Sequence, residues 1–431
     1  MLDMLTIIVE GGIMHSNVGE EMYAQCVDLF PINRSLTGNG VRQTLNYLRK
    51  ILPPLKIHEI PSGISAFDWT TPEEWNVTEA WIADEEDNIL IDFKNSNLHL
   101  MGYSVPIDKI VTKSELMAHL HYLPEQPEAI PFVTSYYKKD WGFCLSQRQL
   151  ETLPEGPFHV FINSTLGPGS MTYGELLIKG KLEDEVLLAT YVCHPSLANN
   201  ELSGPVVLAQ IAKHLLEQPE LKYSYRILFT VETIGCLYFL SQNLSALQRY
   251  LAAGWILTCI GDDRSYSYVP TRMGESLTDR ISRHLLKQLG PSAKEYSWLE
   301  RGSDERQFNA PGINLPVGSL MRSKYGEYPE YHTSLDDLSV ISPDGLAGGF
   351  KMILDAIGIL EQNETYQINV LGEPQLGKRG LYPETSTLET FDKVKNQMNV
   401  ISYLDGEHDL LAIADLCEIT FGEAFEIIQK L

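Results

Sequence analysis

Histidine and acidic side chains stand where apolar runs of this chain end, and such positions suit catalysis or metal binding. The apolar, partly β-branched run 186–192 predicts a buried strand of a mostly parallel sheet. His194 follows that run, and Glu201 lies in the short polar loop before the next helical pattern. Ligand sites in α/β sheets lie outside the carboxyl ends of strands. A histidine in such a loop can also be an ordinary hydrogen-bonding residue, so the other strand ends must decide.

Two later apolar runs end in the same way, the first on Glu232 and the second on Asp262 and Asp263. Much further along, His332 stands in a polar loop. Histidines and carboxylates from separate strand ends, with no cysteine among them, suit Zn²⁺ in an open catalytic site better than in a closed structural one. We therefore expect the imidazoles of His194 and His332 to converge on one divalent cation.

The order of these residues resembles a known group of enzymes. The matching residues are, in chain order, His194, Asn200-Glu201-Leu202-Ser203-Gly204, Glu232, Asp262-Asp263, Ser303-Asp304 and His332. They resemble the zinc aminopeptidases of the bacterial leucyl-aminopeptidase and glutaminyl-cyclase type. More narrowly, nearly the whole chain, from Leu36-Thr37-Gly38 onward, is similar to a bacterial aminopeptidase-like family with an inserted small domain and a winged-helix tail. The resemblance implies an α/β fold, with a zinc-aminopeptidase-like three-layer core around a mostly parallel central sheet.

Two positions depart from the pattern of the wider group. Asn200 stands where that group has an aspartate that bridges two metal ions, and Thr233 stands where it has a second, metal-binding glutamate. A neutral amide oxygen is a poor replacement for a bridging carboxylate. We therefore expect one zinc ion rather than two, held by His194, His332 and a carboxylate, for which Glu201 is the nearest candidate. Asn200 becomes a candidate for contacting the substrate or supporting the site.

The resemblance and the strand-end positions together suggest roles for the other acidic residues. Glu232 would be the general base, which takes a proton from a zinc-activated water and passes it to the leaving amine. Asp262 is a candidate metal ligand, and either Asp262 or Asp263 would otherwise support a ligand or anchor the free amino group of the substrate. Asp304 either supports the site or belongs to an ordinary helix start, in which acidic residues favour the helix dipole.

Loop residues give further candidates. Arg34 lies in a polar loop that is either a simple connector between helices or a segment that reaches the substrate pocket. Tyr331, beside His332, is a candidate substrate-binding or supporting residue. Asp336 and Asp337 either orient the His332 imidazole or cap the next helix, and we favour the cap.

Length and composition limit the class of protein. The 431 residues predict two or three domains, and a hydrophobic fraction of 44% is enough for sizeable cores. A net charge of −24 argues against nucleic acid as a partner. The cysteines lack C-x-x-C spacing, which indicates free thiols of a cytoplasmic protein. The apolar stretch 5–9 is too short to span a membrane, so we expect no membrane association and take residues 1–12 as an extension or short strand.

Changes in hydrophobic pattern and composition along the chain predict three domains. The expected boundaries are 1–58 and 136–375 for the discontinuous aminopeptidase-like core, 59–135 for an inserted β-rich domain, and 382–431 for a winged-helix-like tail. Within the core, we expect 158–162 and 174–178 to be a strand pair that leads into the strand 186–192. The tail is acidic where DNA-binding versions need Lys and Arg, which favours a module for protein contacts or homo-oligomerisation.

Two functions of different classes fit this sequence. The first is a zinc-dependent aminopeptidase-like hydrolase, which cleaves an N-terminal residue from a peptide, or a related amide of a small molecule, by metal-activated water. The alternative is a catalytically inactive aminopeptidase-fold binding protein that retains a metal or amine pocket. Asn200 and Thr233 favour the alternative. A regulator that binds DNA through the tail is disfavoured by the charge of the chain.

Overall fold

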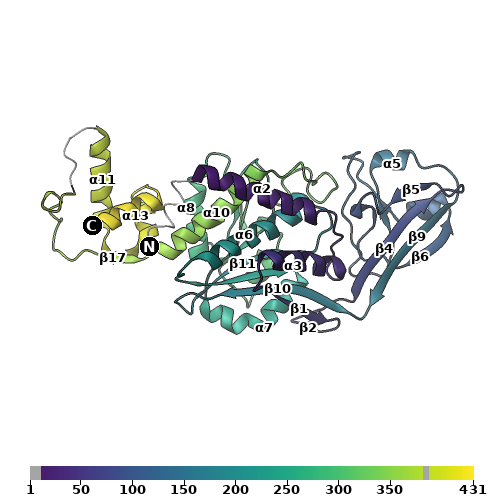
Figure 1. Cartoon of the computed structure of the whole chain (residues 1–431), viewed down its shortest axis with the longest axis horizontal. Coiled ribbons are helices and arrows are strands. Elements are labelled where there is room, and N and C mark those ends of the chain that lie inside the picture. Colours follow the sequence, from purple (N-terminus) through teal and green to yellow (C-terminus); the bar gives the residue numbers. More distant parts are fainter. Residues whose placement is uncertain (1–10, 382–387) are drawn as a thin grey trace.

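The computed structural model describes residues 11–381 and 388–431 (Figure 1). The expected extension or strand at the N-terminus lies mainly outside the described residues. In Figure 1 the α/β core occupies the middle of the molecule, with a small sheet around β4 and β9 at one end and the C-terminal tail around α11 and α13 at the other.

An eight-stranded mixed sheet forms the centre of the core. Its strands, in spatial order, are β1 (Lys56–Pro61), β10 (Ser170–Ile178), β12 (Ser224–Thr230), β11 (Glu185–Tyr191), β13 (Leu251–Leu257), β16 (Val317–Met321), β14 (Ser267–Val269) and β15 (Lys294–Glu295). The central strands β12, β11, β13 and β16 are parallel to one another, whereas β10 and β14 pair antiparallel with them. Residues 186–191 of β11 are all buried, as expected for a parallel strand covered on both faces.

Helices cover both faces of this sheet, so the core has three layers (Figure 1). The helices are α2 (Gly11–Leu29), α3 (Asn39–Ile51), α6 (Ser203–Glu217), α8 (Leu277–Leu286) and α10 (Pro343–Gln362) on one face, and α7 (Ile234–Tyr250) on the other. The short helix α9 (Glu305–Phe308) and the hairpin of β2 (Ser65–Ala66) and β3 (Trp69–Thr70) pack against α7. None of the described helices combines the length and the apolar character that crossing a bilayer requires.

A second sheet forms a smaller β-rich domain with its own core. Its strands, in spatial order, are β5 (Ile89–Asp92), β4 (Glu74–Ala83), β9 (Phe158–Gly167) and β6 (Ile107–Val111). The shorter elements α4 (Lys113–Met117), β7 (Leu120–His121), β8 (Phe143–Cys144) and α5 (Gln147–Glu151) follow β6 along the chain. Phe158, Val160 and Ile162 of β9 are buried in this second core, together with Trp75 and Ile82 of β4.

The pairing of β9 corrects one expectation about the core. We expected 158–162 and 174–178 to pair within the main domain, but β9 pairs with β4 and β6, and β10 pairs with β1 and β12. The small domain therefore continues to residue 167, beyond the expected boundary at 135. Alternating burial along a strand shows that one face is covered, but it does not show which sheet supplies the neighbours.

The C-terminal tail is a compact unit attached to α8. It consists of β17 (Thr365–Gln367), α11 (Leu388–Ser402), β18 (Asp405–Asp409), α12 (Leu410–Leu416) and α13 (Phe421–Lys430). Because β17 pairs with β18, the tail begins before the expected residue 382. Both guanidinium Nη atoms of Arg280 on α8 donate to the carboxylate of Asp409, at 2.8 and 2.6 Å. His284, also on α8, contacts Asp415 through Nδ1 and accepts the backbone N–H of Phe421 at Nε2.

Candidate metal centre

His194 lies just beyond the end of β11, in a segment that folds back toward the core. A single π-helical turn, η2 (Ala198–Leu202), follows it and leads directly into α6. Such turns are often found at functional sites. The turn buries Asn200 and Glu201 beside the imidazole, and the backbone of Ser196 is left-handed, with φ 41°. The tight path between β11 and α6 therefore brings His194 and Glu201 together.

Arg34 and Glu201 hold His194 from one side. Glu201 Oε2 lies 3.0 Å from His194 Nδ1, and Glu201 Oε1 lies 3.3 Å from Arg34 Nε. Because a carboxylate only accepts, Nδ1 carries the proton of this hydrogen bond and Nε2 faces elsewhere. Burial lowers the pKa of His194, but the hydrogen bond and charge of Glu201, together with the charge of Glu232, raise it by more. Arg34, which also donates to the backbone oxygen of His194, is buried.

Glu232 approaches the other nitrogen of the same ring. Its Oε2 lies 3.6 Å from His194 Nε2, and its side chain is 23% exposed, so solvent reaches it. The pKa of Glu232 is raised, mainly by burial, against the opposing positive charges of His194 and Arg306. Glu201 and Glu232 therefore serve different nitrogens of His194, and Glu232 is the carboxylate that a substrate can reach.

His332 lies next to His194, as the sequence predicted. The centroids of the two rings are 5.3 Å apart. Phe132 contacts both rings, at 5.1 and 5.3 Å, and Tyr331 stacks on His332 at 3.9 Å. Burial, with His194 nearby, lowers the pKa of His332 to about 3, so the ring is neutral at physiological pH. Two imidazoles from distant parts of the chain thus lie side by side.

Several of the candidate residues have buried polar atoms without a hydrogen-bond partner. In the described part of the chain they include Arg34 Nη2, Asn200 Oδ1, Glu201 Oε1, Ser303 Oγ and His332 Nε2. Because nearly all buried polar atoms in native proteins are hydrogen-bonded, such unpartnered atoms indicate that a ligand completes them. Imidazole nitrogen and carboxylate or amide oxygen are donors that zinc accepts. The residues present therefore fit a zinc ion.

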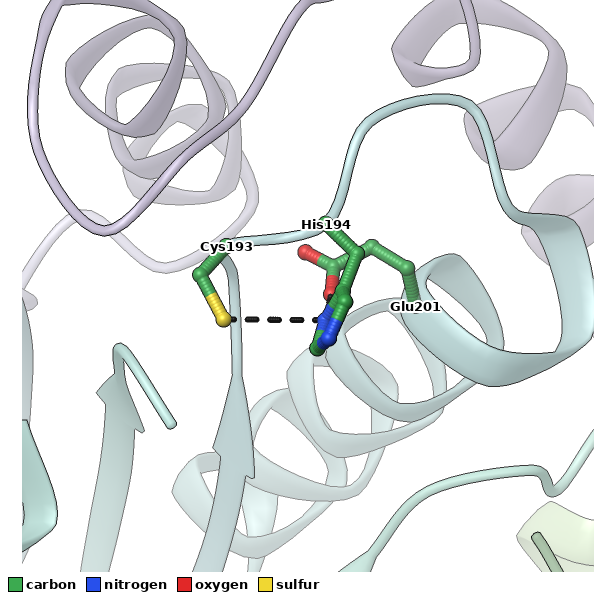
Figure 2. Close-up of side chains that lie close together, drawn as sticks. All are labelled: Cys193, His194 and Glu201. Carbon is green, nitrogen blue, oxygen red and sulfur yellow. Dashed lines mark hydrogen bonds and ion pairs between the residues drawn. The ribbon is translucent and has the colours of Figure 1, made fainter. Parts of the chain in front are cut away.

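A cysteine offers a second way to hold a metal at His194. Figure 2 shows the side chains of Cys193, His194 and Glu201 close together, and one ligand atom from each lies within 4.8 Å of the others. A metal in this group would need the Cys193 thiolate, but burial raises the pKa of that thiol well above its usual value. Cys193 Sγ also accepts the backbone N–H of Glu232 at 3.3 Å. Among the described residues, Cys193, His194 and Glu201 are the one group of three or more histidine, cysteine or acidic side chains whose ligand atoms lie that close together.

Comparisons with known proteins agree with this fold. A family model described as a domain of unknown function (DUF4910) matches residues 23–363. The chain belongs to the DUF4910 family. A second model, a winged helix-turn-helix, matches residues 364–431, which confirms the predicted winged-helix-like tail.

Relatives and solved structures place this DUF4910 member near the peptidases. A Clostridium acetobutylicum protein, provisionally named for polysaccharide biosynthesis with an aminopeptidase-like domain, is 45% identical over 401 residues, which are 93% of this chain and 92% of that protein. A crystal structure from the same organism, provisionally described as a peptidase, has a TM-score of 0.92 at 42% identity and covers 99% of this chain and 97% of its own.

The zinc aminopeptidase of Bacillus subtilis has a TM-score of 0.54 at 13% identity, with coverage of 79% of this chain and 94% of its own. The M28 peptidase precursor of Shewanella amazonensis has a TM-score of 0.54 at 12% identity, with coverage of 84% and 99%. At this identity the likeness concerns the fold alone, and it confirms the aminopeptidase-like α/β architecture predicted from the motifs.

Asp262 and Asp263 of this DUF4910 member have hydrogen-bond partners other than the two histidines. The carboxylate of Asp262 accepts hydrogen bonds from Ser323, through both its backbone N–H and its hydroxyl, from Asn199 Nδ2 and from the backbone N–H of Arg264. Asp263 accepts the hydroxyl of Ser342. Four donors occupy Asp262, so the expectation that it binds the metal is not supported.

Asp304 and Asp336 support the backbone of the site. Asp304 Oδ1 accepts the backbone N–H of Thr233, next to Glu232, and its side chain caps no helix. Asp336 accepts the backbone N–H groups of Asn199 and Asn200. The cap that we expected from Asp336 or Asp337 is wrong, because Ser342 caps α10. Burial holds the pKa of Asp304 well above its usual value and raises that of Asp336 to about 6.

Several residues of the DUF4910 site were not among the predicted ones. Phe132 comes from a loop between β7 and β8 of the small domain, and its backbone N–H donates to the carbonyl of His332 at 2.9 Å. Tyr191 packs edge-on against His194 at 5.2 Å, and its hydroxyl accepts from Asn200 Nδ2 at 2.8 Å. Apolar and aromatic residues in a strand or loop have no sequence pattern that distinguishes a site residue from a core residue. The one available signal was the position of Tyr191 at the end of a predicted strand.

Proposed function

We propose that this DUF4910 member is a zinc-dependent aminopeptidase-like hydrolase, which removes an N-terminal residue or splits a related amide with one zinc ion. The observation that carries the proposal is the meeting of the buried imidazole of His194 and the partly buried imidazole of His332, 5.3 Å apart, with the partly exposed carboxylate of Glu232, 3.6 Å from His194 Nε2.

His194 and His332 would hold the zinc ion through their Nε2 atoms. Glu201, which we expected as a ligand, instead orients His194 through Nδ1, as carboxylates behind metal-binding histidines do. Asn200 Oδ1 is a further unpartnered oxygen among the buried atoms of the site. When bound, zinc polarises a scissile carbonyl and lowers the pKa of water.

Glu232 does the proton transfer in this proposal. Its carboxylate takes a proton from the attacking water and later gives that proton to the leaving nitrogen as the C–N bond breaks. The raised pKa of Glu232 helps its carboxyl group to hold the proton between these two steps. Asp304 fixes the residue after Glu232 through the Thr233 N–H, so it positions the base without touching the substrate.

We include amides carried by sugars in the substrate class, beside peptides, because the 45% identical relative is provisionally named for polysaccharide biosynthesis. All six cysteines are free, which supports action in the cytoplasm. We further propose that the acidic tail contacts a protein partner or a second copy of the chain rather than nucleic acid.

The second candidate function is a binding protein without hydrolysis. Thr233 and Asn200 favour it, because neither provides the carboxylate that the wider group places at that position. In addition, Asp262 is fully engaged by neighbouring donors. Such a protein would keep the zinc ion and the pocket but release its ligand unchanged.

Metal analysis and an activity assay separate the two candidates. Purified protein is analysed for zinc and then assayed with amino-acid p-nitroanilides, beside the Glu232→Gln variant and the matched control Glu155→Gln, whose side chain is 92% exposed. The hydrolase proposal expects zinc, turnover, and a loss of roughly 10²- to 10⁴-fold in kcat for Glu232→Gln alone. Zinc without turnover supports the binding protein. Turnover that survives Glu232→Gln removes the assignment of the base.

A further inference from the structure

Arg306 is tied to the residue that follows the proposed base. Its Nη2 donates to Thr233 Oγ1 at 2.7 Å. Thr233 has a left-handed backbone, with φ 62°, and its N–H donates to Asp304 Oδ1 at 2.8 Å. A left-handed backbone is strained for a β-branched residue and persists only where the surroundings fix it. These contacts therefore hold the Arg306 guanidinium at a set place beside Glu232.

Most donors of this guanidinium are unused. Within the described ranges, the structure shows one hydrogen bond from the Arg306 side chain, that to Thr233, and no ion pair. The guanidinium group has five N–H donors in a planar fork that matches a carboxylate. Arg306 is exposed, so these donors are available to a molecule that enters from solvent.

The surroundings explain why a cation is needed here. Negative charge is concentrated around Glu232. In addition to burial, the charges of Glu201 and Glu305 raise the pKa of Glu232, and those of Glu232 and Glu305 raise the pKa of Asp304. A substrate that carries its own carboxylate would be repelled by these groups. An exposed guanidinium beside Glu232 offsets that repulsion at one place and leaves the rest of the pocket suited to a cationic amine.

The position of Arg306 also indicates which half of a substrate it meets. In the proposed function Glu232 gives its proton to the leaving nitrogen, so that nitrogen lies at Glu232. Arg306, anchored on the next residue, faces what lies beyond the nitrogen. In a dipeptide, one carbon atom separates this nitrogen from the free carboxylate.

We infer that Arg306 recognises a carboxylate on the leaving-amine half of the substrate, so that the preferred substrates are dipeptides or similar short amides with a free carboxyl group. This inference rests on the proposed function for the direction of the substrate. It assigns a specificity-determining role to Arg306, which no sequence motif of the chain had singled out.

The test compares Leu-Gly with Leu-glycinamide, which differ only in the charge of the terminal group. The ratio of their kcat/KM values is measured for the wild type, Arg306→Gln, Arg306→Lys and the control Arg301→Gln. Arg301 is an exposed arginine five residues before Arg306, and its guanidinium lies over the Trp298 ring. A charge-assisted contact gives an expected preference of roughly 10-fold for Leu-Gly in the wild type.

That preference falls close to one in Arg306→Gln, remains in Arg301→Gln and is partly kept in Arg306→Lys, which retains the charge but not the planar fork. Added salt reduces the wild-type preference, because exposed charges are screened. A wild type without preference, or an Arg306→Gln variant that retains it, overturns the inference.

A binding measurement keeps the test independent of turnover. The Glu232→Gln protein, loaded with zinc, is titrated by calorimetry with the reduced-bond analogue of Leu-Gly and with the amide of that analogue. Tighter binding of the carboxylate form, lost on adding Arg306→Gln, supports the inference even if the wild type hydrolyses nothing, in which case only the hydrolase proposal fails. Equal binding of the two analogues, or no binding of either, overturns the inference.

Discussion

The buried pair of Glu201 and Arg34 permits a sharp test of how His194 is held. We predict that Glu201→Gln destabilises the metal-free protein and weakens zinc binding. Both side chains of the pair are fully buried, and the second carboxylate oxygen lies 3.0 Å from His194 Nδ1. Glutamine keeps the shape of glutamate but has no charge and one acceptor oxygen, so it cannot both pair with the Arg34 cation and accept from His194. One of these donors would then face the amide NH₂ group.

The magnitude follows from the loss of charge. Removing one partner of a buried ion pair costs about 3–5 kcal/mol, because the remaining charge is left uncompensated. Arg34→Met removes the other charge, together with its hydrogen bonds to the carbonyls of Leu29 and His194. We expect the double variant to cost less than the sum of the two single variants, by about 2 kcal/mol or more. Loss of a carboxylate behind a metal-binding histidine weakens zinc binding by about 10- to 100-fold.

Urea unfolding in EDTA, followed by circular dichroism, measures the free energy of unfolding, and titration against a competing chelator measures zinc affinity. The control is Glu59→Gln, whose ion pair with Arg42 is partly exposed and should contribute about 1 kcal/mol or less. If Glu201→Gln lowers the free energy of unfolding no more than Glu59→Gln does, the buried charge of Glu201 does not stabilise the fold. If Glu201→Gln abolishes zinc binding, Glu201 is a ligand rather than the residue that orients His194.

Three further outcomes are expected. Burial lowers the pKa of His332 from 6.5 to about 3, so between these pH values the unfolded chain binds a proton that the folded chain does not. The free energy of unfolding therefore decreases as the pH is lowered through that window. Metal-free wild type should lose about 2 kcal/mol more than His332→Gln between pH 7 and pH 5 in urea unfolding, and equal losses would contradict the shift. Arg280→Ala, which breaks the bidentate contact with Asp409, should speed trypsin cleavage within 373–381 while the core stays intact, and an unchanged rate would mean that the contact does not hold the tail. Mass spectrometry should find one zinc ion per chain and none in His194→Gln, whereas two ions would refute the single-metal proposal.

The residues nearest the strand ends were the most predictable part of the site. His194 and Glu232 follow buried apolar runs directly, so their place outside the sheet follows from the rule for parallel strands. His332 was found from its place in the aminopeptidase order of motifs. Each of the three lies where its position in the chain led us to expect.

Other parts depended on contacts that sequence does not reveal. Asp262 stands five residues beyond the last residue of β13, and the donors of Ser323 from another strand end determine where its carboxylate lies. Arg306 gave no signal, because its place depends on a hydrogen bond to the side-chain hydroxyl of Thr233, a residue distant in sequence. The alternating strand β9 could have joined either sheet, and only the folded arrangement selects its partners.

The segment around Phe132 joins the small domain to the loop of His332 by paired backbone contacts. Pro131 forms a bridge with Thr333, and the backbone of Ile130 accepts the N–H of Ser334. A chimera that exchanges the whole small domain would thus replace Phe132, which contacts both His194 and His332, and the backbone partners of the His332 loop. Engineers who exchange this domain should therefore keep the stretch 130–134 with the core and exchange the paired strands β4, β6 and β9 together.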